Sequence, residues 1–266
     1  MSWIQTGSTI CFKPYTLEEA LHGLAEAGFD NVEIGAVKGF LQHLDPDAPE
    51  VDEAQRLLDR YGLRCVSLSG HAPLHTDEGV RRLTNVLGAA KALDAVVLNT
   101  FTGDAETPDE VERFKANARA IADEAEEAGI RLCIETDSNL LPTAEIGMGL
   151  LDEIGHDWIQ INYDPGNVVY YTGARPEEDL RNGLGRYGHV HLKDQRGGKG
   201  VLDFPVLGDG EIDLPSILRD LAGSGFAGPV SMEIEFADYV YPPWEECVEA
   251  ARRGKAYWDS LDGAPA

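Results

Sequence analysis

The feature that most constrains this chain of 266 residues is the repetition, eight times, of a strand-like segment followed by a helical one. The strand-like segments are short runs rich in β-branched and other apolar residues, and the helical ones carry apolar residues every three or four positions. Strands that alternate with helices pair in parallel through right-handed crossovers. Eight such units in about 250 residues predict a single α/β domain, a (β/α)8 barrel, with an open doubly wound sheet as the alternative.

The boundaries follow from the apolar pattern and from capping residues. We place the strands at residues 7–12, 31–37, 65–72, 95–101, 131–137, 158–164, 189–194 and 229–235. We place the helices at residues 16–29, 51–61, 78–93, 107–129, 143–154, 176–187, 214–224 and 244–260. Thr16 and Glu19 have the spacing of a capping box at the start of the first helix. Because no linker interrupts the pattern, we expect one domain over residues 1–262 and a loose tail over 263–266.

The sequence HVHLKD at residues 189–194 places imidazole groups among strands that a barrel should bury. Alternation along the strand puts His191 on the side that faces into the barrel. Three other expected strands carry a carboxylate with the same inward parity: Glu135, Asp164 and Glu233. The inward side of a barrel turns polar near the carboxyl ends of its strands, where active sites lie. We therefore expect these four residues to bind one divalent metal ion.

Three carboxylates and one imidazole favour an octahedral ion over a zinc site rich in cysteine and histidine. We expect Mn²⁺ first, with Mg²⁺, Co²⁺ or Zn²⁺ as alternatives. Two neighbouring oxygens of a hydroxy-ketone would fill the remaining positions, and Glu135 and Glu233 would remove and return a proton next to the carbonyl. The alternative interpretation of each inward carboxylate is an ion pair, for which Lys193 is the available partner.

Further polar residues on or next to the inward side are expected to contact the substrate: Glu33, His71, Asn99, Asn167 and Lys193. For His71, a hydrogen-bonded role in a loop is the alternative. The glycine-rich segment 196–213 has neither a P-loop nor a dinucleotide-binding pattern. We interpret it as a flexible loop or as a lid over the substrate, in which Lys193, Arg196 or Lys199 would hold an anionic group.

Charge and cysteine content limit the partners. A formal net charge of −25 argues against binding nucleic acid or an anionic membrane through a broad basic surface. We expect no signal peptide and no membrane span, because the chain has neither a basic start nor an apolar run of about 18 residues. The four cysteines form no CxxC pattern, so we expect buried free thiols in a cytoplasmic protein. The expected partner is a small sugar or polyol ketone, and a homo-oligomer stays open as an alternative to a monomer.

Several motifs together resemble those of the xylose isomerase-like TIM-barrel superfamily, in particular its sugar phosphate isomerase/epimerase group. They are IETD, NYDPGN, HVHLKD, LGDGEID and GFAGPVSMEIE. The similarity covers essentially the whole chain and is strongest from Arg131 to Phe236. It implies one divalent metal held by Glu135, Asp164, His191 and Glu233, with Glu135 and Glu233 as acid and base.

The resemblance implies an isomerase or epimerase of a keto-sugar, inosose or related polyol ketone, working through a metal-stabilised enediolate. Some relatives instead eliminate a β-leaving group from a 3-keto-sugar, a 3-keto-glycoside or an inosose, so a lyase is the second hypothesis. An apurinic endonuclease-like phosphodiesterase is a distant third, because Asn167 stands where many relatives carry a histidine. A non-catalytic sugar-binding subunit is the fourth, and the presence of Glu135 and Glu233 argues against it.

Overall fold

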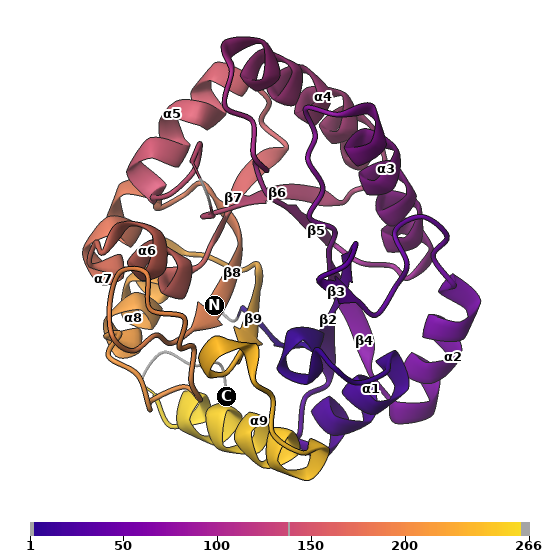
Figure 1. Ribbon diagram of the computed structural model, residues 1–266, viewed down its shortest axis with the longest axis vertical. Helices are drawn as coiled ribbons and strands as arrows, with labels where there is room; N and C mark the ends of the chain where they lie inside the picture. The colour runs from indigo at the N-terminus through magenta and orange to yellow at the C-terminus, as the bar shows by residue number, and fades with distance from the viewer. Residues whose placement is uncertain (1–2, 138, 262–266) are drawn as a thin grey trace.

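The computed structural model describes residues 3–137 and 139–261. In this part of the chain, eight parallel strands close into a barrel inside a ring of helices (Figure 1). The barrel strands are β1 (Ile4–Ser8), β2 (Asn31–Val37), β4 (Arg64–Ser69), β5 (Val97–Thr100), β6 (Arg131–Glu135), β7 (Ile159–Tyr163), β8 (Tyr187–Lys193) and β9 (Pro229–Glu233). Because β1 pairs with both β2 and β9, the sheet has no open edge there. The predicted (β/α)8 barrel is confirmed.

The helices follow the strands in sequence order around the outside of the barrel. They are α1 (Leu17–Glu26), α2 (Val51–Tyr61), α3 (Asp77–Ala92), α4 (Pro108–Glu127), α5 (Ala144–Ile154), α6 (Pro165–Thr172), α7 (Pro176–Asp179), α8 (Leu214–Ser224) and α9 (Trp244–Asp259). The predicted capping box is present: Thr16 Oγ1 accepts the N–H of Glu19, and the Glu19 carboxylate accepts the N–H of Thr16. The expected domain end at residue 262 and the tail at 263–266 lie outside the described residues.

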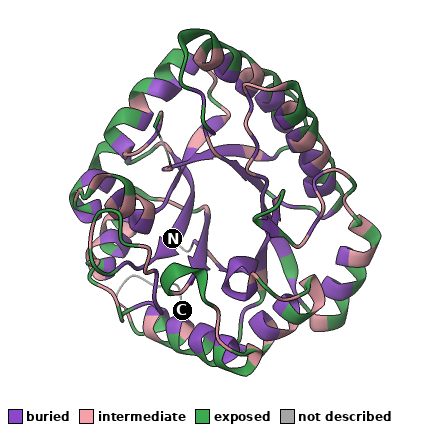
Figure 2. Cartoon of the chain, in the orientation of Figure 1, coloured by how far each residue is buried: buried purple, intermediate pink, exposed green. Residues whose placement is uncertain are grey.

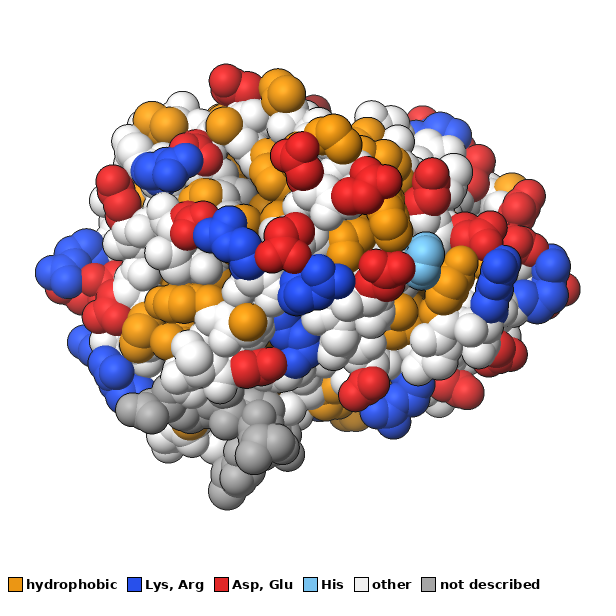
Figure 3. Space-filling view, turned by 90° about the horizontal axis from the view of Figure 1, so that it is seen from below, with side chains coloured by type: hydrophobic (Ala, Val, Ile, Leu, Met, Phe, Trp, Pro, Cys, Tyr) orange, Lys and Arg blue, Asp and Glu red, His pale blue; other side chains and the backbone are white. Residues whose placement is uncertain are grey.

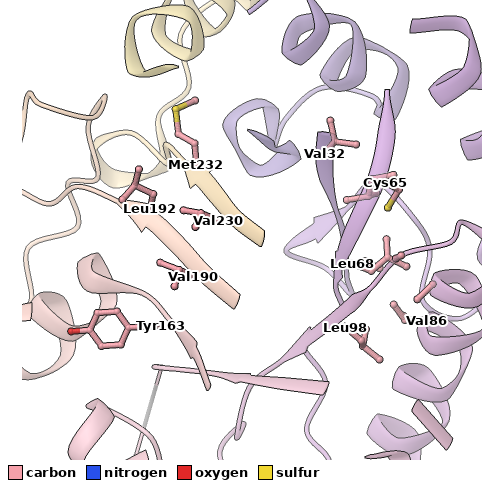
Figure 4. Packing of buried hydrophobic residues seen from close by; sticks show 14 of the residues in the cluster. Val32, Cys65, Leu68, Val86, Leu98, Tyr163, Val190, Leu192, Val230 and Met232 are labelled. Carbon is pink, nitrogen blue, oxygen red and sulfur yellow. The ribbon is translucent and has the colours of Figure 1, made fainter. Parts of the chain in front are cut away.

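Apolar side chains fill the layer between the strands and the helices. The helices are buried on the side that faces the barrel and exposed on the other side (Figure 2). Leu68 of β4 and Leu98 of β5 lie near Val86 of α3 (Figure 4). A Cβ added to Gly254 of α9 would come 2.8 Å from the sulfur of Met232 in β9. Met232 therefore points toward the helices, and its neighbours along the strand point into the barrel.

Two segments differ from the sequence-based boundaries. The first strand was expected at residues 7–12, but β1 ends at Ser8 and a 3-10 helix, η1 (Thr9–Phe12), follows. Ser8 Oγ accepts the N–H of Ile10 at 3.4 Å, so a cap interrupts a run whose β-branched residues resemble a strand. The helix expected at 176–187 is instead α7 and a second 3-10 helix, η2 (Leu180–Gly183), and α6 was not predicted.

One short strand was also missed. β3 (Leu41–Gln42) pairs antiparallel with the end of β2, between the strand expected at 31–37 and the helix expected at 51–61. A third 3-10 helix, η3 (Ala237–Tyr239), follows β9.

The surface is charged and mixed. On the face seen in Figure 3, acidic and basic side chains are interspersed, with no extended basic patch. The cysteines in the described part are free and buried, as predicted: Cys11, Cys65, Cys133 and Cys247. Within the described ranges, no helix has both the length and the apolar character needed to cross a membrane.

Candidate active site

His191 of β8 lies at the centre of a buried group of carboxylates inside the barrel. Its Nδ1 is 3.0 Å from Glu135 Oε1 and 3.7 Å from Asp164 Oδ2. Its Nε2 is 2.9 Å from Glu33 Oε1 and 3.5 Å from Glu233 Oε1. The barrel thus brings together the four residues predicted to bind metal, and it adds Glu33 to them.

Three of these residues have donor atoms close enough together to hold an ion. One atom each of Glu135, Asp164 and His191 lies within 4.8 Å of the others. Glu135 Oε2 and Asp164 Oδ2 are buried, and neither accepts a hydrogen bond from the residues that the structure describes. Each has an ion-pair partner at 2.8 Å, which is His71 Nε2 for Glu135 and Lys193 Nζ for Asp164. Buried carboxylate oxygens left in this way beside an imidazole fit a divalent cation. The structure therefore contains a possible metal-binding site.

Asp164 is held in place by the start of α6. Its Oδ1 caps this helix by accepting the N–H of Asn167 at 2.9 Å, and Pro165 occupies the first helical position. The N–H of Asp164 donates to Thr136 Oγ1 at 2.7 Å. These contacts fix one carboxylate oxygen and leave Oδ2 directed at the site.

Lys193, the last residue of β8, forms ion pairs with several of the same carboxylates. Its Nζ lies 2.8 Å from Asp164 Oδ2, 2.9 Å from Glu233 Oε2 and 2.5 Å from Glu235 Oε1. Burial opposes the charged form, but the attraction of these carboxylates outweighs it and holds the pKa of Lys193 well above its usual range. The ion-pair interpretation is therefore realised for Asp164 and Glu233, and a metal-binding role for Glu233 stays a prediction.

The two glutamates predicted as acid and base have different environments. Burial raises the pKa of Glu233 to about 7, despite the attraction of His191 and Lys193. Burial also opposes ionisation of Glu135, but the attraction of His191 and His71 outweighs it and holds the pKa of this carboxyl well below its usual range. Two carboxyl groups with pKa values pushed apart are typical of an acid–base pair.

Two residues predicted to contact substrate, Glu33 and Asn99, lie instead in a polar network beneath the pocket. Asn99 Nδ2 donates to Glu33 Oε2 at 2.7 Å, and His189 Nε2 is 3.1 Å from the same oxygen. Both residues are fully buried and neither lines the pocket. Alternation along a strand gives the side on which a residue lies but not its depth in the barrel, and a substrate contact of either residue stays a prediction. One atom each of Glu33, His189 and His191 also lies within 4.8 Å of the others.

His71 and Asn167 line the pocket, and their predicted contact with substrate stays a prediction. His71 Nε2 is 2.8 Å from Glu135 Oε2, and its ring stacks on Phe101 with centroids 5.0 Å apart. Asn167 Nδ2 donates to Glu135 Oε1 at 3.0 Å. Both side chains therefore orient Glu135 while they border the pocket.

The pocket opens at the carboxyl ends of the strands, where the fold predicts an active site. The residues that line it include His71, Glu135, Asn167, His191, Lys193, Glu233, Asp137, Glu235, Tyr171, Phe40 and Tyr239. Asp137 and Glu235 were missed as site residues, although both share the inward parity of Glu135 and Glu233 in the sequence. That parity was the available signal.

The glycine-rich segment predicted as a loop or lid is fastened by Asp194, the residue after Lys193. Asp194 Oδ2 accepts the N–H groups of Gly208 at 2.9 Å and Gly210 at 3.0 Å, and its Oδ1 accepts that of Ile212 at 3.2 Å. Arg196, a predicted anion contact, instead pairs with Asp203 at 2.8 Å. The segment is therefore an anchored loop in this structure.

Replacing Asp194 with alanine should lower the free energy of unfolding by about 2–4 kcal/mol, because several backbone N–H groups lose their acceptor. Urea unfolding followed by circular dichroism measures this. The matched control is Asp209→Ala in the same loop, where an exposed ion pair with Arg253 is lost and a change below about 1 kcal/mol is expected. Equal effects of the two variants would contradict an anchoring role for Asp194.

The closed parallel barrel and its carboxylate–histidine cluster define a class: (β/α)8 proteins with a possible metal site at the carboxyl ends of the strands. A family model described as xylose isomerase-like TIM barrel matches residues 21–257. The chain belongs to this family.

Similar proteins include several named sugar epimerases. The chain is 26% identical over 240 residues to L-ribulose 3-epimerase of Mesorhizobium japonicum, covering 82% of this chain and 75% of that protein. It is 28% identical over 147 residues to L-ribulose-5-phosphate 3-epimerase UlaE of Salmonella paratyphi C, covering 54% of this chain and 48% of that protein. The match to UlaE thus spans about half of each protein.

Solved structures share the fold. D-allulose 3-epimerase from Methylomonas sp. superposes with a TM-score of 0.77 at 20% identity, covering 96% of each chain. An IolI protein with a binding zinc atom superposes with a TM-score of 0.77 at 18% identity, covering 95% of this chain and 96% of that one.

Proposed function

We propose that this protein is a divalent-metal-dependent isomerase or epimerase of a keto-sugar, inosose or related polyol ketone. The observation that carries the proposal is the convergence of Glu135, Asp164 and Glu233 on His191, which lines the pocket together with Glu135 and Glu233. Similarity to an enzyme named L-ribulose 3-epimerase supports this class of activity. We place Mn²⁺ first among the candidate ions.

The four converging residues would hold the metal, which when bound polarises a substrate carbonyl and stabilises negative charge on its oxygen. His191 and His71 hold the pKa of Glu135 well below its usual range, which favours the ionised form, whereas burial raises the pKa of Glu233 in the protein without metal. We assign Glu135 as the first proton acceptor and Glu233 as the group that acts on the opposite face. Glu135 takes the proton from the carbon next to the carbonyl, and the C–H electron pair forms a C=C bond as the carbonyl electron pair moves to its oxygen. The oxygen then returns that pair to re-form the carbonyl, and the carbon takes a proton from Glu233 on the opposite face. The reverse reaction exchanges the two roles.

The neighbouring residues orient this pair. Asn167 and His71 hold the two oxygens of Glu135, and Ser8 Oγ donates to Glu233 Oε1 at 3.2 Å. Lys193 holds Glu233 Oε2 at 2.9 Å. A carboxylate held at both oxygens loses less freedom when substrate binds, which favours proton transfer in a fixed direction.

Exchange of substrate protons in deuterated water tests the proposal. Incubation with Mn²⁺ and a panel of keto-sugars and inososes should exchange the proton on one carbon and give an epimer or isomer, followed by NMR spectroscopy. A lyase would give an unsaturated ketone that absorbs in the ultraviolet. Absence of exchange with every ketone and with Mn²⁺, Mg²⁺, Co²⁺ and Zn²⁺ would overturn the proposal.

At saturating Mn²⁺, replacing His71 with alanine should raise KM by about 10–100-fold while the protein stays loaded with metal, because a hydrogen bond to substrate is lost. Steady-state kinetics and elemental analysis measure the two effects. His75→Ala is the control, since His75 faces the exposed Asp104 at 3.6 Å outside the pocket. Loss of metal with an unchanged KM would show that His71 acts on the metal site instead.

A further inference from the structure

The pocket wall is strongly acidic. Four carboxylates line it: Glu135, Asp137, Glu233 and Glu235. Among the lining residues that the structure describes, Lys193 is the one lysine or arginine, and its ammonium already contacts Asp164, Glu233 and Glu235. Apart from the divalent ion of the proposed function, which the carboxylates and His191 would hold, a dianionic phosphate would meet no lysine or arginine among the described lining residues that is not already paired with carboxylates.

Lys13, at the rim of the pocket, does not supply the free positive charge that a phosphate group would need. Its Nζ lies 3.4 Å from the centroid of the Phe40 ring and 4.1 Å from that of Tyr239, and both rings line the pocket. Its ammonium is thus held against two aromatic rings by cation–π attraction, and Lys13 itself does not line the pocket. Phosphate recognition normally combines several donors, such as an arginine fork or the N–H groups at a helix start.

Asp137 can accept hydrogen bonds from a ligand, whereas a phosphate group would need donors. It follows β6, and its backbone pairs with Leu141. The hydroxyl of Tyr171 hydrogen-bonds its carboxylate, and Tyr171 also lines the pocket. Oδ1 of Asp137 is buried and has no hydrogen-bond partner in the described part of the chain. A buried carboxylate oxygen of this kind is satisfied by a donor that arrives with the ligand.

We propose that Asp137 accepts a hydrogen bond from a hydroxyl group of the substrate, and that the substrate is an uncharged polyhydroxy ketone. This inference rests on the proposed function, because it takes the pocket as the substrate site. Hydroxyl groups donate to carboxylates, whereas a phosphate dianion only accepts hydrogen bonds and would face four carboxylates. Asp137 is thus a specificity-determining residue, distinct from the pair that moves protons.

The choice of substrates follows from the two relatives, one named for L-ribulose and one for L-ribulose 5-phosphate. The Mn²⁺-loaded enzyme should favour the free ketose over its phosphate ester by at least about tenfold in kcat/KM. Lys13→Met should leave this ratio unchanged. A preference for the phosphate ester that disappears in Lys13→Met would overturn the inference and leave the epimerase proposal intact.

Asp137→Ala should weaken ketose binding by about 10–100-fold, because a charge-assisted hydrogen bond is lost. A set of deoxyketoses identifies the contacted hydroxyl: for one of them, the wild type and Asp137→Ala should have equal affinity. Asp137→Asn, which keeps a carbonyl oxygen, should recover part of the loss. Thermal melting and metal content check that each variant is folded and loaded.

Calorimetric titration of L-ribulose into the Mn²⁺-loaded proteins makes the test independent of turnover. Weaker binding of L-ribulose to Asp137→Ala than to the wild type supports the contact, even if no ketone undergoes proton exchange. Absence of exchange would overturn the proposed function but not the contact with Asp137. Equal affinity of the wild type and Asp137→Ala for every ketose, with both proteins folded, would overturn the role of Asp137.

Discussion

A Glu233→Gln variant is expected to keep at least part of its metal and to lose about 10²–10⁴ in turnover. The amide oxygen of glutamine can still coordinate an ion, but it does not accept a proton at neutral pH. The carboxyl group that it replaces has a pKa raised to about 7 by burial, which suits proton transfer in both directions. Measuring kcat together with metal content separates the loss of chemistry from the loss of the ion.

The matched control is Glu235→Gln. Glu235 also pairs with Lys193, at 2.5 Å, but it is not a predicted ligand or base, so we expect a loss of less than about tenfold. Glu135→Gln should lose net conversion as well, yet differ from Glu233→Gln in which substrate or product proton exchanges with deuterated water. Near-full turnover of Glu233→Gln with metal bound would show that this carboxylate is only a ligand, with His71 or Lys193 as the next candidate base.

A His191→Ala variant is expected to bind Mn²⁺ more than about 100-fold more weakly than the wild type, because even residues that merely support a metal ligand change affinity by 10–100-fold. His191 contacts Glu135, Asp164, Glu33 and Glu233 at once, so its removal opens the centre of the donor set. Chelation should abolish activity in the wild type, and Mn²⁺ or Co²⁺ should restore it there but not in the variant at the same concentration.

His156→Ala is the control for this experiment. His156 pairs with Asp123 at 3.1 Å, outside the barrel, and its loss should leave metal affinity unchanged. Thermal melting of His191→Ala checks that loss of the ring has not unfolded the barrel. Full metal content in a folded His191→Ala protein would place the ion elsewhere, and anomalous diffraction from bound Mn²⁺ would locate it.

Much of the fold could be predicted because the responsible forces act locally. β2, α2 and α8 begin and end at the predicted residues, since apolar periodicity gives their type, and left-handed Gly62 and Gly225 end the two helices. β1 and η1 show where this fails. Thr9 and Ile10 favour a strand by residue type. The hydroxyl of Ser8 instead accepts the N–H of Ile10 and caps a short 3-10 helix.

The site could be predicted in part for a geometric reason. Closure of the barrel brings all inward positions near one axis, so parity alone was enough to gather His191 with Glu135, Asp164 and Glu233. Parity does not give the height of a residue along that axis. Glu33 therefore lies beneath the pocket, although it has the same parity as Glu135, and depth depends on strand stagger that the sequence does not display.

The hydrogen bonds of Asp194 limit which loop residues can be replaced to change the substrate specificity of the enzyme. Lys193 contacts the carboxylates of the pocket, and the next residue along the chain fastens Gly208, Gly210 and Ile212. A Cβ on Gly210 would come 2.1 Å from Asp194 Oδ1, so position 210 tolerates no residue larger than glycine while Asp194 keeps its place. Loop grafting should therefore exchange residues 197–206 and retain 208–212. A graft that moves the retained turn would shift Asp194, and with it the ammonium group one peptide bond away.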